Sequence, residues 1–398
     1  MKKTNLQSSK TLRGIIKKSH KSRGFYVDDN KYDAQFKLGK KEMFKAMPGD
    51  LVEFSLTEKG WAKIQKVISE NTDEFIGKIF TRGKRLYTSP IGYENDLKVL
   101  IREPHPKAMR NGSIGKFSMA KQPQIDSLPE ANLKFVFDQE NEFGLAYELS
   151  VTSHNLKHEW PKSVINEAKK LKSKKFDTES VIDLRDKIFV TIDGKNAKDY
   201  DDAVLGEKDE EGNLILYVAI ADVGRYVDIA SNLDKEACDR STSVYFSQKV
   251  IPMLPEELSN DLCSLKPNED RFCLVCKTKV DELGNLVDTS FFEAIINSKS
   301  RLTYATVTRE AEKNQFKKPY ANSLRALLEI YKRLKANRTA RGSLELEVPT
   351  YIPKLENQKI KKFENSPRDI SHMMIEEFML AANISAAKLC IKNQIPSI

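Results

Sequence analysis

The sequence predicts an α+β protein of several domains, with two small β-barrels of the OB type followed by a mixed α/β domain. The chain has 398 residues, enough for two to four domains. Short strand-like segments separated by turn residues fill the first 150 positions, a pattern typical of small barrels. After Ser150 the sequence changes to longer apolar runs and helical stretches, which indicates a further domain built on a buried sheet.

The first barrel is predicted over residues 11–70, behind a basic arm at 1–10 that we expect to be disordered. Polar turns at 28–30 and 48–50 fit tight connections between strands. The expected strands are 14–16, 24–27, 32–36, 51–54 and 61–68. Five short strands in so few residues favour a closed barrel over an open sheet.

The second barrel is predicted over residues 71–150, from a pattern that is less regular than the first. The expected strands are 75–80, 85–87, 97–101 and 133–137. The barrel itself is expected to end near residues 141–142 or slightly later.

The mixed domain is predicted over residues 151–398. The run 214–221 is almost continuously apolar, which is the mark of a strand buried on both faces, and the polar turn 210–213 precedes it. Residues 272–276 and 281–285 predict a further strand and turn. Helices are expected over 162–172, where proline stands near the start, and over 320–341 and 370–392.

The charge of the chain is concentrated at its front. The net charge is +9, and residues 1–50 hold 13 Lys or Arg against 5 Asp or Glu. Such a basic segment favours a polyanionic partner, although a solubilising tail or attraction to a membrane surface would also be basic. Five scattered cysteines fit reduced thiols in the cytosol, and no apolar run approaches the roughly 20 residues that span a bilayer.

Four aspartates within ten positions form the most unusual feature: Asp193, Asp199, Asp201 and Asp202. Two unit charges 4 Å apart repel by about 1 kcal/mol in water and by about 4 kcal/mol at an effective dielectric constant of 20, so converging carboxylates need compensation. No single helix or strand brings all four together, but a loop that turns at Gly194 can. Oxygen ligands suit Mg²⁺ or Mn²⁺. The alternatives are a solvated acidic loop or a calcium site, and the spacing does not match an EF-hand.

Aromatic and basic side chains in the first barrel are candidate nucleic-acid contacts. Arg23, Phe25 and Tyr26 stand near Lys17 and Lys18 in the sequence. Aromatic rings stack on bases and lysines neutralise phosphates. Because neighbours alternate along a strand, either Phe25 or Tyr26 must face the barrel core.

Several long motifs in the second half resemble the ribonuclease II / ribonuclease R (RNB) family of 3′→5′ exoribonucleases. They are the aspartate loop 193–204 and the segments 218–223, 242–246, 250–255, 258–265, 300–304 and 375–383. The resemblance implies that the two barrels are cold-shock-like and that residues 151–398 are the N-terminal part of the catalytic domain. Family members continue with a Ser-Pro-Ile-Arg-like motif and a terminal RNA-binding barrel. We therefore expect a C-terminally truncated chain with impaired catalysis.

The resemblance also implies roles for individual side chains. Asp193 and Asp202 would contact the metal, Asp199 would support the metal site, and Asp201 would be the carboxylate most critical to the chemistry. Tyr245 would pack on a base near the 3′ end.

The carboxylate expected at the terminal nucleotide belongs to either Glu376 or Glu377, and spacing does not decide between them. The implied activity is Mg²⁺-dependent, processive release of 5′-mononucleotides from single-stranded RNA by a cytoplasmic monomer with no membrane partner. The alternative is a non-catalytic RNA-binding or chaperone protein with a degenerate nuclease body.

Overall fold

The computed structural model describes most of the chain in two compact units. One unit comprises residues 1–156 and 355–361, and the other comprises 157–354 and 362–398. The described residues are 11–18, 24–29, 34–39, 41–71, 73–93, 97–103, 110–124, 127–137, 142–172, 177–247, 249–344, 348–357, 359–366 and 368–397. The basic arm predicted at 1–10 lies outside them.

The first barrel is closed by five strands, as the sequence predicted, and the structure gives their order as β1-β2-β3-β5-β4. The elements are β1 (Leu12–Lys18), β2 (Phe25–Asp29), β3 (Ala34–Leu38), the 3₁₀ turn η1 (Glu42–Phe44), β4 (Leu51–Leu56) and β5 (Ala62–Ser69). Alternate apolar residues fill its core, among them Ile16, Val27 and Phe54. Gly14 is required because a Cβ there would lie 2.5 Å from the Asp28 carbonyl oxygen.

The second barrel is also closed, in the order β10-β8-β7-β6-β9. Its strands are β6 (Glu74–Arg82), β7 (Arg85–Pro90), β8 (Val99–Ile101), β9 (Ile114–Lys121) and β10 (Glu130–Val136). The short strand β8 pairs parallel to β10 and antiparallel to β7, which closes the barrel.

A helix that the sequence pattern did not reveal follows the second barrel. Helix α1 (Glu142–Ser153) occupies a stretch whose sequence predicted a barrel domain up to residue 150. Its apolar residues are not confined to one stripe, so the period of 3.6 is weak. The helix is tied to the barrel by Lys116, whose ammonium group lies 3.1 Å from Glu148 and 3.3 Å from Glu74.

The two barrels share part of their packing. Leu97, from the segment before β8, is buried in the core of the first barrel. Tyr93 stacks on Phe25 with ring centroids 5.8 Å apart. These contacts fix one barrel against the other, because both side chains exclude water from the boundary.

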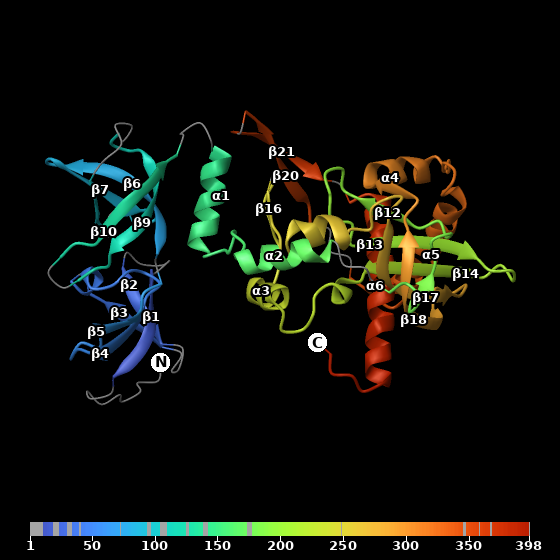
Figure 1. Cartoon of the computed structure of the whole chain (residues 1–398), viewed down its shortest axis with the longest axis horizontal. Coiled ribbons are helices and arrows are strands. Elements are labelled where there is room, and N and C mark those ends of the chain that lie inside the picture. Colours follow the sequence, from blue (N-terminus) through green and yellow to red (C-terminus); the bar gives the residue numbers. More distant parts are fainter. Residues whose placement is uncertain are drawn as a thin grey trace. The chain divides into compact units, whose positions relative to one another are not determined.

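The second unit is built on a seven-stranded mixed sheet in the order β11-β18-β17-β14-β13-β12-β19 (Figure 1). Its strands are β11 (Ile182–Asp183), β12 (Val190–Asp193), β13 (Asp202–Lys208), β14 (Leu214–Ala221), β17 (Asp270–Val280), β18 (Leu286–Asn297) and β19 (Ser300–Thr303). The predicted strand at 214–221 is confirmed as β14, near the middle of the sheet.

Helices cover both faces of this sheet, so its strands are buried on two sides. One face carries α4 (Tyr304–Glu312), α5 (Ala321–Ala340) and α6 (Ile370–Lys392). The other carries α2 (Lys162–Leu171), α3 (Asn232–Arg240), the 3₁₀ turn η2 (Val223–Arg225) and the π-turn η3 (Leu258–Leu262). The helices predicted at 162–172, 320–341 and 370–392 are confirmed as α2, α5 and α6.

Two separate hairpins complete the described chain. One joins β15 (Val244–Tyr245) to β16 (Val250–Ile251), and the other joins β20 (Thr350–Glu356) to β21 (Lys359–Ser366). Within the described residues, no helix combines the length and the apolar character that a membrane crossing requires.

Candidate active site

The aspartate loop joins two neighbouring strands of the seven-stranded sheet. Strand β12 ends at Asp193 and strand β13 begins at Asp202, and the two strands pair antiparallel. Asp199 and Asp201 lie in the connection between them. The sheet therefore holds the first and last aspartates on rigid backbone, while the loop carries the two in between.

A buried serine holds the loop in place. Ser264 is fully buried; its Oγ accepts a hydrogen bond from the Tyr200 N–H at 3.1 Å and donates one to the Lys198 carbonyl at 2.8 Å. The carbonyl of Asp201 accepts a further bond from the N–H of Ala221, at 2.9 Å. The loop that carries the acids is thus fixed by backbone contacts, so its carboxylates remain available for other partners.

An arginine from β19 holds the other end of the loop. Strand β19 runs parallel to β12, and the Arg301 Nη2 donates to the carbonyls of Gly194 and Lys195, each at 2.6 Å. Its guanidinium also lies 5.7 Å from the centre of the Tyr200 ring. The arginine therefore positions the loop backbone and, by its charge, stabilises the ionised form of nearby Asp193.

The carboxylates on the two strand ends lie in a strongly desolvated, negatively charged environment. Burial raises the pKa of Asp193 to about 6; the nearby Thr191 hydroxyl and Arg301 oppose the rise, and other loop aspartates add to it. Burial, together with the charges of Asp193 and Asp201, raises the pKa of Asp202 to about 7. The Oδ2 atom of Asp193 is buried and has no hydrogen-bond partner among the described residues. Such a group favours an external cation.

Of the two aspartates inside the loop, Asp201 is exposed and Asp199 is half-buried. Desolvation by the surrounding protein and the charge of Asp199 raise the pKa of Asp201. The Oδ2 of Asp199 accepts a hydrogen bond from the Tyr245 hydroxyl at 3.1 Å. As they stand, the described His, Cys, Asp and Glu side chains include no group of three or more that could hold a metal ion. The assignment of all four aspartates to one cation therefore stays a prediction.

Further side chains around the loop received no role from the sequence. Tyr304, the first residue of α4, faces the acids: burial raises its pKa and the charges of Asp193 and Asp202 add to the rise. His372 of α6 stacks on its ring, with centroids 3.9 Å apart, and the Ser371 hydroxyl donates to its carbonyl at 3.0 Å. The only sequence signal was that Tyr304 closes one of the family-like motifs.

A polar pocket opens beside the loop, with a volume of about 600 Å³. The residues that line it are Asn196, Lys198, Asp199, Ser243, Phe246, Ser247, Lys249, Val250, Pro252, Glu256, Ser259 and Asn260. Tyr245 stands next to this wall on β15 and is 65% exposed. A volume of several hundred Å³ with hydrogen-bonding groups suits a ligand of nucleotide size.

The two candidate glutamates on α6 differ in accessibility. Arg338 Nη1 lies 3.1 Å from a carboxylate oxygen of Glu376 and 2.8 Å from one of Glu377. Arg368 pairs with Glu376 as well. The side chain of Glu376 is 37% exposed and that of Glu377 only 8%. Glu376 is therefore the glutamate that a ligand can reach.

The barrel residues proposed for nucleic-acid contacts differ in how accessible their side chains are. Phe25 is buried and stacks on Tyr93, so it does not present its ring to a ligand, and the expectation for Phe25 is corrected. Its neighbour Tyr26 is half-buried on the other side of β2. The ammonium of Lys18 donates to the Gly92 carbonyl and lies over the Tyr93 ring.

Lys17 is engaged at a distance of 2.6 Å by Asp28. Arg23 lies outside the described residues.

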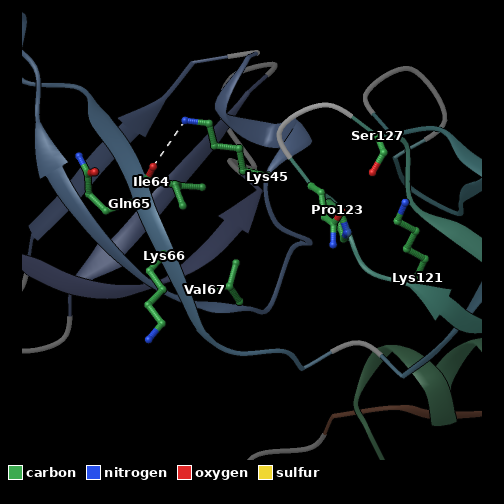
Figure 2. Close-up of a pocket in the computed structure, with 9 residues that line it drawn as sticks. Lys45, Ile64, Gln65, Lys66, Val67, Lys121, Pro123 and Ser127 are labelled. Carbon is green, nitrogen blue, oxygen red and sulfur yellow. Dashed lines mark hydrogen bonds between the residues drawn. The ribbon is translucent and has the colours of Figure 1, made fainter.

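A basic pocket of about 440 Å³ lies between the two barrels (Figure 2). It is lined by Lys45, Ile64, Gln65, Lys66, Val67, Lys121, Pro123, Gln124 and Ser127. Lys45 is held by Glu42 at 2.8 Å, whereas Lys66 and Lys121 enter no ion pair with the described residues. None of the described residues that line the pocket is a carboxylate, so the charge of this described lining favours an anionic ligand.

The fold and the site define a class of protein in which paired OB-type barrels precede a mixed-sheet domain with an acidic loop between two adjacent strands. The family model of the RNB domain matches residues 181–398, more than half of the chain. The chain therefore belongs to the RNB family, which confirms the resemblance found in the motifs.

Individual relatives agree with this assignment. Ribonuclease R of Vibrio parahaemolyticus is 35% identical over 84% of this chain, and the chain spans 41% of that protein. The structure of Mycoplasma genitalium ribonuclease R in complex with ribose-methylated single-stranded RNA superposes with a TM-score of 0.82 and 25% identity, over 96% of this chain and 62% of that one. Yeast Ssd1, a pseudonuclease, shares the fold at a TM-score of 0.60 and 15% identity, over 98% of this chain and 56% of that one.

Proposed function

We propose that this chain carries the acidic site of a 3′→5′ exoribonuclease, which shortens single-stranded RNA processively and releases 5′-mononucleotides. The observation that carries the proposal is the aspartate loop: desolvated carboxylates, anchored through their backbone, beside a polar pocket of nucleotide size. The family assignment and the similarity to ribonuclease R support the same reading.

The donor set of the loop fits a hard divalent cation. Asp193, Asp199, Asp201 and Asp202 would hold Mg²⁺, or Mn²⁺, through carboxylate oxygens, which these ions prefer. The unpartnered buried oxygen of Asp193 and the high pKa of Asp202 both indicate that the site lacks compensating positive charge from the protein. Such a cation activates water and stabilises the leaving oxygen of a phosphodiester.

The protein groups around the loop have separable tasks in this proposal. Tyr245 would stack on a base near the 3′ end, because its ring is exposed while its hydroxyl is fixed on Asp199. Glu376, rather than the more buried Glu377, would contact the terminal nucleotide. Asp201, the most accessible of the four acids, would be the carboxylate most critical to the chemistry.

The barrels would guide the strand toward this site. Lys66 and Lys121 in the inter-barrel pocket offer cationic groups for phosphates, and single-stranded RNA is the partner we propose. The monomeric state and the cytoplasmic location belong to the same proposal, since the scattered thiols fit a reducing compartment.

A non-catalytic RNA-binding protein is the second candidate. It is favoured by one observation: the described carboxylates do not form a ready-made set of three metal ligands. In that case the barrels would bind RNA and the acidic loop would have no chemical role.

The two functions are separated by incubating the chain with 5′-labelled single-stranded RNA and Mg²⁺. We expect a ladder of shortened products that ends in a short oligonucleotide, and no ladder with Asp201→Asn, while RNA affinity changes less than about threefold because binding rests on many distributed contacts. Binding without shortening, unchanged by Asp201→Asn, would support the second candidate instead. An equal loss of binding and cleavage would contradict the role given to Asp201.

A further inference from the structure

Trp61 is fixed in an exposed position on the hairpin between β4 and β5 of the first barrel. The backbone N–H of Thr57 donates to the Trp61 carbonyl at 2.9 Å, and the backbone N–H of Trp61 donates to the Thr57 hydroxyl at 3.1 Å. Gly60, at φ +72°, allows the tight turn. Trp61 is nevertheless 39% exposed, so a large aromatic side chain lies at the surface instead of in the core.

The indole forms one wall of a shallow pocket of about 560 Å³ whose exposed lining is mainly apolar. The residues around it are Gly39, Lys41, Glu42, Thr57, Glu58, Lys59, Trp61, Ala62 and Lys63. Glu42 is engaged by Lys45 at 2.8 Å, which leaves Glu58 as the exposed acid. In the described part of the chain, Lys41, Lys59 and Lys63 enter no ion pair.

A fourth lysine already makes a cation–π contact with the Trp61 ring. The ammonium of Lys37, on β3, lies 4.7 Å from the centre of the Trp61 ring. Gly39 passes beside the indole, and even a Cβ there would lie 3.8 Å from its Cε3, so the absence of a side chain leaves this edge uncovered. An aromatic surface ringed by cations matches a ligand that combines a flat ring with negative charge.

We propose that the Trp61 pocket is a stacking site for one base of single-stranded RNA, with Lys41, Lys59 and Lys63 around the flanking phosphates. The hairpin between the last two strands is one of the loops through which OB barrels contact oligonucleotides. This site is separate from the β1–β2 residues considered above. It is also separate from the inter-barrel pocket, because no described residue lines both pockets. It rests on the proposed function only in taking RNA as the ligand.

The chain offers a direct reporter, because it contains two tryptophans. Trp160→Phe in the second unit leaves Trp61 as the single tryptophan. At position 160 a phenyl ring can still stack under the guanidinium of Arg240, which lies 3.5 Å from the ring centre of Trp160. Combined with Asp201→Asn to suppress hydrolysis, this variant is titrated with an adenine-rich 20-mer RNA. Tryptophan emission and its acrylamide quenching report on the site, and the anisotropy of end-labelled RNA reports on total binding.

We expect RNA to quench the emission of Trp61 and to protect it from acrylamide in parallel with the anisotropy change. Trp61→Ala should weaken RNA binding about tenfold, equivalent to about 1.4 kcal/mol, and Trp61→Phe clearly less. Ile68→Ala is the matched control, since Ile68 lies on β5, the strand that follows Trp61, and is also 39% exposed. It should leave the affinity unchanged.

Two outcomes would overturn the site. One is normal RNA binding with unaltered Trp61 emission. The other is equal RNA affinity for the Trp61→Phe variant, the Ile68→Ala control and a folded Trp61→Ala variant. Absence of any RNA binding would overturn both this site and the proposed function. Binding that protects Trp61, without shortening of RNA by the chain that keeps Asp201, would support the site and refute the exonuclease proposal.

Discussion

Replacing Asp202 by asparagine should make the metal-free protein more stable at pH 8. The pKa of Asp202 rises from 3.8 to about 7 in the folded chain, because of burial and the charges of Asp193 and Asp201. A carboxyl whose pKa is raised by folding stabilises the fold fully only below the unfolded pKa, and this contribution is lost as the pH rises through the folded value. At pH 8 the native chain therefore carries the whole cost of the charge.

The size of the effect follows from the shift. The difference between a pKa of 3.8 and one of about 7 corresponds to about 4 kcal/mol as an upper limit. Because the side chain is half-buried and its neighbours titrate with it, we expect about 2 kcal/mol at pH 8 and clearly less at pH 5. For a unit of this size that corresponds to an increase in Tm of roughly 4–8 °C.

The assay is thermal unfolding followed by circular dichroism in EDTA, at pH 5 and pH 8. Asp209→Asn is the control of opposite sign, since a hydrogen bond from Asn213 lowers the pKa of Asp209, so this change should reduce Tm at pH 8. Added Mg²⁺ should stabilise the native chain more than Asp202→Asn. A variant no more stable than the native chain at pH 8, or a gain that is equal at both pH values, would refute the reasoning.

Two further predictions concern the loop anchor and the inter-barrel pocket. Ser264→Ala removes two hydrogen bonds inside the protein and should lower the free energy of unfolding by about 1–3 kcal/mol in urea titrations, with a larger proportional loss of RNA shortening than of RNA binding. Unchanged stability would show that the serine does not hold the loop. Lys66→Gln combined with Lys121→Gln should reduce the slope of log affinity against log salt by about 1–2, measured by RNA anisotropy. A parallel displacement of the line, with the slope kept, would exclude phosphate contacts there.

The local sequence pattern was sufficient to predict a helix or strand where the apolar residues of that element follow a regular or continuous pattern. Helix α2 carries a strong periodic apolar signal and strand β14 a nearly continuous apolar one, and both formed where expected. Helix α1 lacked an apolar stripe and was missed, because its packing on Lys116 and the second barrel, not its own pattern, makes it stable.

The aspartate cluster was visible in the sequence because four acids in ten positions are unfavourable without compensation. The sequence did not reveal what surrounds it. Ser264, Arg301 and Tyr304 join the loop from 60 or more positions further along the chain. The sheet order, which places β19 beside β12, brings Arg301 and Tyr304 to the acids.

The sequence by itself determined the class of each domain, the position of the acidic loop and the family, since all three depend on residues close together in the chain. Tertiary structure alone decided that Phe25 and not Tyr26 is buried, that Glu376 is more accessible than Glu377, and that Asp202 has the more strongly raised pKa of the two strand-end acids. The physical reason is that burial and electrostatic coupling depend on which distant side chains are packed against a residue, and local periodicity does not specify those neighbours.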